Sequence, residues 1–358
     1  MNVLFVSGHP AQVHNFRLVR EMLIRHGHQV FWLTTDKDIA TNLLNVYGIP
    51  YRLLQKPRKN LWGKIVALVR NVWFEIGWLR KNKIDVCISR TCPYTCISAK
   101  LLHKPHIILD DTEHAAAKIQ FFARMANTVI VPQCFYFTIT PSQIKFAGNI
   151  ELFYCHPKRY RWSEPWSLLG VKENTPYAVV RFVKWDAYHD VNLTGGFTNE
   201  SKIELVKQLA KHIRVFISSE AELPEELENY RIHIPIERMH DVLCSASLFI
   251  GESATMASES VVLGTPAIYV DEIGRGYTDE ECANGLLYMF RPETQKNAIS
   301  KAAEVISPEF DMEAWKNKQK SWLDKTIDPT AFLCWFIENY PESERIMHSD
   351  PDYQYRFR

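Results

Sequence analysis

Short apolar runs alternate with segments of helical spacing along the first half of the chain. The runs are VLFVSG from Val3, QVFWLTT from Gln29, DVCISR near Val86, HIILDD near Ile108 and TVIVP near Val129. They are rich in β-branched residues, whereas residues 18–24 and 39–47 between them repeat apolar side chains with the period of a helix. This alternation is typical of a parallel, doubly wound sheet, and it predicts a Rossmann-like N-terminal domain over residues 1–154.

A second series of the same kind follows an aromatic and proline-rich stretch. YAVVRF starts at Tyr177, a helical segment covers 203–213, and the runs RVFISS, RIHIP, SLFIG and PAIYV come after it. We therefore expect a linker at 155–176, a second Rossmann-like domain at 177–340 and a polar, aromatic tail at 341–358. Because ligands bind beyond the carboxyl ends of parallel strands, the chain is predicted to be an α/β protein whose two Rossmann-like domains face each other across a cleft.

The composition is that of an ordinary globular protein. Hydrophobic residues make up 46% and charged residues 23% of the 358 positions, which excludes a largely disordered chain. Lys and Arg number 42 against 41 Asp and Glu, so the net charge of +1 gives no general attraction to nucleic acid, which we do not expect as a partner. The start MNVLFVSGHP lacks the basic segment of a secretory signal, and we expect a cytoplasmic protein.

Metal binding is not expected from the pattern of potential ligands. The eight cysteines lack the paired spacing of a zinc site, and even the closest three, Cys87, Cys92 and Cys96, are better explained as reduced thiols. Asp110 and Asp111 are adjacent and so do not have the Asp-x-Asp spacing of a metal-binding loop.

The segment IGESATMASESVVLGTPAIYV, residues 250–270, has the pattern of an anion site. A strand is followed by the small residues Ser253 and Ala254, which would let a phosphate approach the N–H groups of Thr255 and Met256 at the positive end of a helix. Glu259 would lie one turn further on, within reach of ribose hydroxyls. The alternative is that Ser253 or Thr255 only caps the helix and Glu259 lies on a solvated face.

Two basic residues of the second half are candidates for the same phosphates. Arg181 ends an apolar strand, where a guanidinium is costly unless an anion or a carboxylate meets it. A phosphate contact and a structural salt bridge both meet this requirement, and both stay open. His189 follows in the next loop as a further donor.

The candidates for proton transfer lie in the first half. DDTEH follows the strand HIILDD, and Asp111, Glu113 and His114 there, with His9 and His14 of the first loop, are candidate catalytic residues. Clustered carboxylates raise one another's pKa and histidine titrates near neutrality, so either kind can remove a proton from a hydroxyl. The alternative is that Asp111 or Thr112 caps a helix and the acids are exposed.

Several of these motifs together resemble a known family. They are GHPAQVHNF at Gly8, DDTEHA at Asp110, VVRF with His189 and Asp190 after it, FISSE at Phe216, and TMASES with LGTP. They resemble an uncharacterised prokaryotic family of GT-B-like proteins, a domain of unknown function, over most of residues 1–300. More remotely the chain is similar to UDP-N-acetylglucosamine 2-epimerase and to GT-B glycosyltransferases, whose second domain holds the nucleotide.

The resemblance implies a separate binding role for each of several residues of the second domain. It implies phosphate binding by the backbone at residues 253–256, ribose binding by Glu259 and a phosphate contact from Arg181. Members of the family usually carry Gly-Gly before the Thr-Met, where this chain has Ser253 and Ala254, and these side chains narrow the loop.

The function expected from these features is that of a metal-independent GT-B-type glycosyltransferase of polysaccharide biosynthesis. It would need no cofactor and would move a sugar from a nucleotide-sugar, with a UDP-sugar as the expected donor, to a glycan or lipid-linked acceptor. Two alternatives stay open. A nucleotide-sugar 2-epimerase would use the same pocket and the acidic cluster to handle the proton at C2, and a nucleotide-sugar-binding protein would bind without turnover.

Residues 61–83 are predicted to form a helix with an apolar stripe. The stripe comprises Ile65, Leu68, Val69, Val72, Trp73, Ile76 and Leu79. Lys64, Arg70, Arg80 and Lys81 add positive charge, and Trp62 and Trp78 are candidate anchors at an interface. Such a stripe is more often a face turned to the core, but it also fits peripheral contact with the inner face of a membrane or with another protein.

Overall fold

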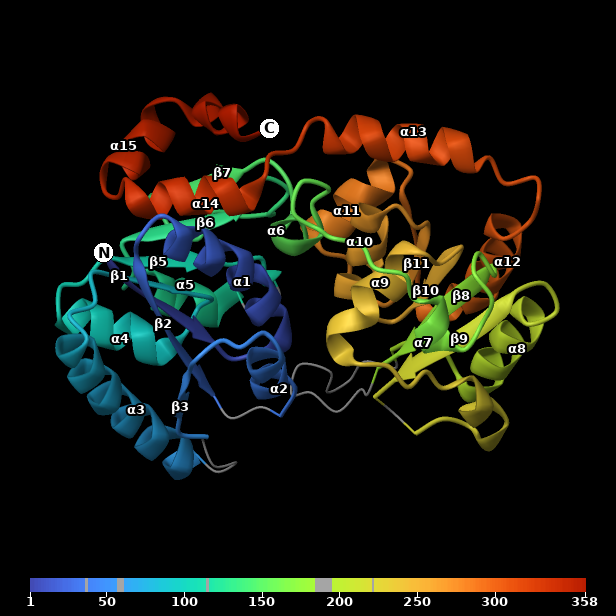
Figure 1. The fold of residues 1–358 in the computed structure, drawn as a ribbon, viewed down its shortest axis with the longest axis horizontal. Coiled ribbons are helices and arrows are strands. Elements are labelled where there is room, and N and C mark those ends of the chain that lie inside the picture. The colour runs from blue at the N-terminus through green and yellow to red at the C-terminus, as the bar shows by residue number, and fades with distance from the viewer. Residues whose placement is uncertain (36–37, 57–60, 114–115, 184–194, 221) are drawn as a thin grey trace. The chain divides into compact units, whose positions relative to one another are not determined.

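The computed structural model describes residues 1–35, 38–56, 61–113, 116–183, 195–220 and 222–358. The chain forms two compact units (Figure 1). The first combines Met1–Tyr154 with Thr326–Arg358, and the second is Cys155–Lys325. Both ends of the chain therefore belong to the first unit.

The first unit is built on a parallel sheet. Within the described residues it has seven strands in the order β3-β2-β1-β4-β5-β6-β7. They are β1 (Asn2–Ser7), β2 (Gln29–Thr35), β3 (Arg52–Leu54), β4 (Val86–Ser89), β5 (His106–Leu109), β6 (Thr128–Pro132) and β7 (Gln143–Phe146). All residues of β4, β5 and β6 are buried, as expected for central strands covered on both faces.

Helices connect these strands, as the alternating sequence pattern predicts. They are α1 (Pro10–Arg25), α2 (Asp38–Val46), α3 (Leu61–Lys81), α4 (Pro93–Leu101) and α5 (Ala116–Ala123), with the short α6 (Leu152–Cys155) at the boundary between the units. The start of α1 has local causes: Pro10 occupies the first turn, and Nδ1 of His9 accepts a hydrogen bond from the Ala11 N–H at 3.3 Å.

The second unit repeats the architecture with a smaller parallel sheet. Its order within the described residues is β12-β11-β10-β8-β9. The strands are β8 (Tyr177–Phe182), β9 (Arg214–Ser219), β10 (Leu248–Gly251), β11 (Ala267–Val270) and β12 (Leu287–Phe290). The helices are α7 (Trp166–Leu169), α8 (Asn199–Leu209), α9 (Met239–Cys244), α10 (Ala254–Leu263), α11 (Gly276–Ala283), α12 (Gln295–Val305) and α13 (Met312–Leu323), with 3₁₀ turns η2 (Glu225–Tyr230), η3 (Ile236–Arg238) and η4 (Pro292–Thr294).

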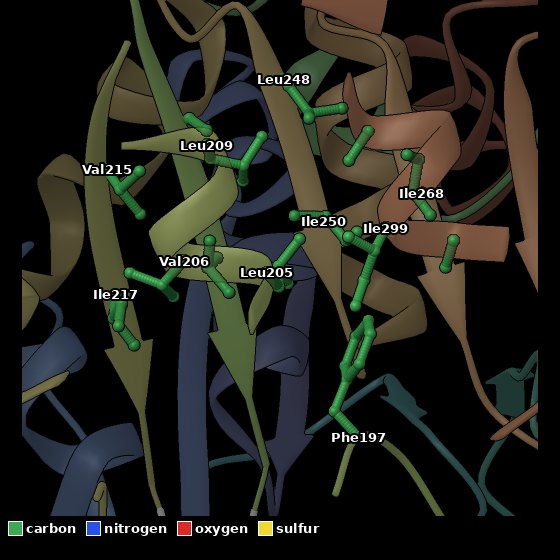
Figure 2. Close-up of a cluster of buried hydrophobic side chains, with 14 of the residues drawn as sticks. Phe197, Leu205, Val206, Leu209, Val215, Ile217, Leu248, Ile250, Ile268 and Ile299 are labelled. Atoms are coloured by element: carbon green, nitrogen blue, oxygen red, sulfur yellow. The ribbon is translucent and has the colours of Figure 1, made fainter. Parts of the chain in front are cut away.

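The core of the second unit lies between this sheet and the helices α8 and α12 (Figure 2). Leu205, Val206 and Leu209 of α8 meet Ile217 of β9 and Ile250 of β10, and none is more than 1% exposed. Burying an aliphatic side chain of this size contributes about 1.5–3 kcal/mol, so the helix is held mainly by its apolar face.

One of the predicted strands is absent. RIHIP, residues 231–235, makes a single isolated bridge between Arg231 and Ile217 and then continues as irregular chain into η3. Pro235 follows directly and has no N–H to give to a strand ladder. The prediction of a strand at this position was therefore wrong.

The segment predicted as a linker is packed against the second unit. Asp241 of α9 accepts hydrogen bonds from the Tyr160 hydroxyl and from the Ser163 N–H, the latter at 3.0 Å. Nε1 of Trp162 donates to Ser245 Oγ at 2.8 Å, and Arg238 donates to the Glu164 carbonyl at 2.9 Å. Residues 155–176 are thus part of the second unit rather than a separate connection.

The last residues return to the first unit, which corrects the expected boundaries at 177–340 and 341–358. They form α14 (Pro329–Glu338), α15 (Glu342–Ser349) and the 3₁₀ segment η5 (Pro351–Phe357). The Thr330 hydroxyl donates to the Phe153 carbonyl at 2.7 Å, and Oε1 of Gln354 accepts from the Ala147 N–H at 2.7 Å. Helix α14 also packs against α1 (Figure 1). The second domain therefore ends before residue 326, and the tail is an ordered part of the first.

Candidate functional site

The strand order of the second sheet reverses between β8 and β10. The chain runs outward from β8 to β9 on one side and from β10 to β11 and β12 on the other. At such a switch point the connections leave in opposite directions and open a crevice beyond the carboxyl ends of the two strands. Here those ends carry Arg181 and Gly251, which are paired in register.

Gly251 lies unusually close to the neighbouring strand. A Cβ atom at this position would come within 2.4 Å of the Arg181 carbonyl oxygen, closer than real Cβ contacts. Because glycine alone avoids this collision, the two strand ends approach each other without a side chain between their backbones. The residues that follow Gly251 start from a fixed position beside β8.

Ser253 caps the helix that starts there. Its Oγ accepts the Met256 N–H at 3.3 Å, so the capping alternative is present and Met256 is not a spare phosphate donor. The N–H groups of Ala254 and Thr255 lie in the first turn, where a helix supplies no acceptor of its own. Ala254 is 6% exposed, so its methyl group is largely covered by protein. Gly264, with a φ of 98°, ends the helix in the left-handed conformation.

Glu252 is a part of this site that the sequence analysis missed. Its side chain is buried, and its two carboxylate oxygens accept the Val183 N–H at 2.8 Å and the Phe197 N–H at 2.7 Å. It therefore ties the chain leaving β8 to the chain entering α8. The carboxylate also lies just before the positive end of α10, which favours a negative charge.

Arg181 forms the salt bridge that the sequence left open. Its guanidinium donates to Ser218 Oγ at 2.7 Å and pairs with the carboxylate of Glu220, both on the β9 side. Its Nε is buried and has no hydrogen-bond partner among the described residues. The negative charge that balances the Arg181 guanidinium is thus supplied by the protein itself, through Glu220. The side chain of Glu220 is half exposed.

Glu259 is buried rather than solvated. It is 6% exposed, and Oε1 lies 3.1 Å from Nε2 of His240, a buried residue of α9. The alternative of a solvated helix face is therefore wrong for Glu259. His240 is a second residue that the sequence did not indicate, because its proximity depends on the packing of α9 against α10.

The first sheet has its own switch point between β1 and β4, and the DDTEH motif follows β5, the strand beside β4. Asp110 is buried there and accepts five hydrogen bonds, among them the Thr91 hydroxyl at 2.6 Å and the Arg90 guanidinium at 3.1 Å. Burial by itself would raise the pKa of Asp110, but Arg90 and the hydroxyls and N–H groups around it hold that pKa below its ordinary value. Asp110 is thus a buried anion that joins the loops after β4 and β5.

The remaining candidates of the first unit have different surroundings. Asp111 pairs with Arg90, and Glu113 is buried with Oε1 accepting the Tyr136 N–H at 3.1 Å. His9 is exposed at the start of α1. His14 is buried, its ring centroid 5.3 Å from that of Tyr154.

Two predicted residues, His114 and His189, lie outside the described residues. Among the others, the first sheet brings Asp110 and Asp111 together around Arg90, which the sequence analysis did not single out. His14 packs instead between the rings of Tyr47, which directly follows α2, and Tyr154 of α6, so it faces the interior of its unit.

Comparisons with known proteins agree with this architecture. A family model described as "Protein of unknown function (DUF354)" matches residues 7–275. No protein with a curated description matches the chain in sequence.

Three solved structures illustrate the similarity of fold. UDP-GlcNAc 2-epimerase from Neisseria meningitidis bound to UDP-GlcNAc has 11% identity and a TM-score of 0.63, over 90% of this chain and 98% of that one. Spinosyn rhamnosyltransferase SpnG with thymidine diphosphate has 13% identity and a TM-score of 0.64, over 95% and 100%. Acinetobacter baumannii MurG has 14% identity and a TM-score of 0.60, over 94% and 99%. The fold is thus GT-B-like, with two Rossmann-like domains.

Proposed function

The chain belongs to the DUF354 family of proteins of unknown function, and from that premise we propose that it is a metal-independent GT-B-type glycosyltransferase. It moves a sugar from a UDP-sugar to a glycan or lipid-linked acceptor. The observation that carries the proposal is the switch point of the second sheet. There Gly251, which ends β10 shortly before α10 begins at Ala254, is paired with Arg181 of β8, and its missing side chain lets the two backbones come close. A nucleoside diphosphate is the ligand that such a crevice suits best.

In this proposal the second unit binds the nucleotide-sugar donor. The phosphates are placed at the N–H groups of Ala254 and Thr255, at the positive end of α10, and the ribose at Glu259. His240 holds the Glu259 carboxylate in one orientation through their 3.1 Å contact. Two of the similar structures hold UDP-GlcNAc and thymidine diphosphate, which supports a nucleotide-linked ligand for this chain.

In this proposal the first unit supplies the base that removes the proton of the acceptor hydroxyl. In the transfer, the acceptor oxygen forms a bond to C1 of the sugar, the bond from C1 to the phosphate oxygen breaks, and the diphosphate leaves. A base removes the acceptor proton, and the candidates are Asp111, Glu113, His114 and His9. The leaving diphosphate is stabilised by the start of α10 and by positive side chains, an arrangement that needs no metal ion.

A nucleotide-sugar 2-epimerase is the second candidate function. The specific observation in its favour is the set of acidic groups after β5, since epimerisation requires a group that takes a proton from C2 and returns one to the other face. The similar fold of an epimerase bound to UDP-GlcNAc adds support. A binding protein without turnover is the third.

One experiment separates the three candidates. The full chain is incubated with UDP-sugars, with and without glycan or lipid-linked acceptors, and the products are analysed by mass spectrometry and chromatography. We expect acceptor-dependent release of UDP and an acceptor heavier by one sugar. An isomer of unchanged mass would indicate an epimerase, and binding without any product would indicate a binding protein. Gly251→Ala, in which the new methyl group collides with Arg181, serves as the control without a formed site.

The lipid-linked acceptor is supported by the surface of α3. The predicted stripe is split: Val72, Ile76 and Leu79 are buried, whereas Ile65, Val69 and Trp73 are exposed. Trp78 packs against Phe31 at a centroid distance of 5.3 Å and is no surface anchor, but Trp62 is 77% exposed. No helix among the described residues has the length and apolarity needed to pass through a bilayer.

The charges of α3 indicate an anionic bilayer as the occupant of this surface. Its basic residues Lys64, Arg70, Arg80 and Lys81 are exposed, and its single acid, Glu75, is buried. Apolar and aromatic side chains flanked by cations are the pattern of a helix that lies in a membrane interface. The test is co-sedimentation with vesicles of anionic and of neutral lipid. Binding to anionic vesicles should be lost in Trp62→Ala with Trp73→Ala and kept in Phe121→Ala, which removes an exposed ring elsewhere. Wild-type protein that stays in the supernatant would exclude the membrane contact.

A further inference from the structure

Three metal-ligating side chains of different types converge at the end of α1. Nδ1 of His26 lies 2.7 Å from Oε1 of Glu338 and 3.8 Å from Sγ of Cys334. One ligand atom from each of the three lies within 4.8 Å of the other two. Cys334 and Glu338 are one turn apart on α14, so the helix presents both on the same face. His26 is about 300 residues away from Cys334 and Glu338 in sequence, so no ligand-spacing motif indicates the group.

A second histidine orients the carboxylate of this group. Nε2 of His28 lies 3.0 Å from Oε1 of Glu338, while its Nδ1 lies 3.2 Å from the Met1 amine. A carboxylate oxygen only accepts, so Nε2 carries the proton that it donates to Glu338. This is the contact that an outer residue makes to a carboxylate ligand of a metal ion.

We propose that His26, Cys334 and Glu338 form a zinc-binding site. An imidazole nitrogen, a thiolate and a carboxylate are ligands of Zn²⁺, whereas Mg²⁺ and Ca²⁺ prefer oxygen alone. Bonds of about 2.0–2.3 Å to a tetrahedral ion set the ligand atoms roughly 3.5 Å apart. The sulfur and nitrogen are already near that separation, and the Glu338 oxygen must move away from His26 by less than about 1 Å.

The surroundings suit an ion that enters from solvent and holds two segments together. The side chain of His26 is 46% exposed, so an ion has access, while Cys334 is buried at 1%. Binding releases the thiol proton of Cys334 to solvent. It also requires His26 to carry its proton on Nε2 instead of Nδ1, and it leaves the fourth position to water. The site would join the end of α1 to α14 and thus fasten the returning C-terminal segment to the first unit.

The experiment uses the full chain, stripped with a chelator and then titrated with Co²⁺. Tetrahedral Co²⁺ bound through a thiolate gives strong visible bands and a sulfur-to-metal charge-transfer band. We expect these bands to saturate at a single Co²⁺ per chain, to disappear on addition of Zn²⁺ and to persist with excess Mg²⁺. Zinc should also slow amide hydrogen exchange in α14.

Matched variants decide whether these residues are the ligands. Cys334→Ser should abolish the charge-transfer band, and His26→Ala should weaken Co²⁺ binding at least tenfold. Cys282→Ser, which alters an exposed cysteine of the other unit, should change nothing. Circular dichroism checks folding, and if the buried Cys334→Ser unfolds, the exposed His26→Ala decides alone. The absence of thiolate bands in the wild type, or an unchanged titration in His26→Ala, would overturn the proposal.

Discussion

Glu259 and His240 lie against each other at 3.1 Å, both buried, on neighbouring helices of the second unit. A buried carboxylate fixed by a histidine on one helix has its orientation set in advance. It can therefore hold a ribose with little loss of side-chain freedom.

The first prediction concerns this pair. Glu259→Ala should weaken UDP binding about tenfold or more, because a charge-assisted hydrogen bond contributes roughly 1.5–3 kcal/mol. His240→Ala should weaken it in the same direction by releasing Glu259. Titration calorimetry measures both, with His212→Ala, an exposed histidine after α8, as the control. Unchanged affinity in both variants would remove the ribose assignment.

The second prediction uses the salt bridge between Arg181 and Glu220. If Arg181 contacts a phosphate, Glu220→Gln should tighten UDP binding severalfold, because it removes the competing anion. The cost in stability is small, about 0–1 kcal/mol, since Glu220 is half exposed. Glu226→Gln, which alters the exposed pair with Lys207, is the control. Equal or weaker binding in Glu220→Gln would mean that Arg181 serves only the fold.

The third prediction separates proton transfer from binding. Glu113→Gln should lower turnover by about 10²–10⁴-fold while UDP affinity stays unchanged. The amide oxygen of Gln can still accept the Tyr136 N–H, so the buried contact survives the substitution. His114→Ala is the companion variant. Full activity in both, measured once a substrate pair is found, leaves Asp111 and His9 as the candidate bases.

The fourth prediction is a pH dependence of stability. Burial between α3 and α4 raises the pKa of Glu75 to about 7, although the hydroxyls of Thr95 and Ser98 oppose the shift. Since the folded-state pKa exceeds the unfolded one, the folded state holds the extra proton, and stability falls as the pH rises from about 4.5 to about 7. Glu75→Gln should remove this fall and stabilise the protein by up to about 3 kcal/mol above pH 7.

Urea unfolding at about pH 5 and about pH 8 checks this prediction. The variant should gain at the higher pH and be unchanged at the lower, whereas Glu304→Gln, an exposed carboxylate, should gain at neither. A gain of equal size at both pH values would show that packing, not ionisation, is responsible.

The sequence predicts those parts of the fold that depend on the pattern of neighbouring residues along the chain. The apolar runs at Val86, Ile108 and Val129 became the buried strands β4, β5 and β6 because a central parallel strand needs apolar residues on both faces. The short β3 and β7 carry no such run, whereas β12 lies in the apolar run 286–290, which the sequence analysis did not identify as a strand. The return of α14 and α15 escaped prediction because contacts such as Thr330 with Phe153 depend on distant parts of the chain.

The residues of the candidate site also differ in whether the local sequence identifies them. Ser253 could be recognised as a cap from the residues around it. Glu252 and His240 could not, because their partners Val183, Phe197 and Glu259 come close only through the sheet order and helix packing. Arg90 is ordinary in sequence and acquires its role only when β4 and β5 become neighbours.

The return of residues 326–358 to the first unit has a consequence for synthesis. The second unit is one continuous stretch of chain and can fold as soon as it leaves the ribosome. The first has to wait for α14, α15 and η5, whose partners on α1 and β7 are made before the second unit. Until residues 326–358 have been made, those surfaces stay uncovered, and a nascent chain stopped before residue 326 carries one finished unit and one that is open to chaperones and proteases.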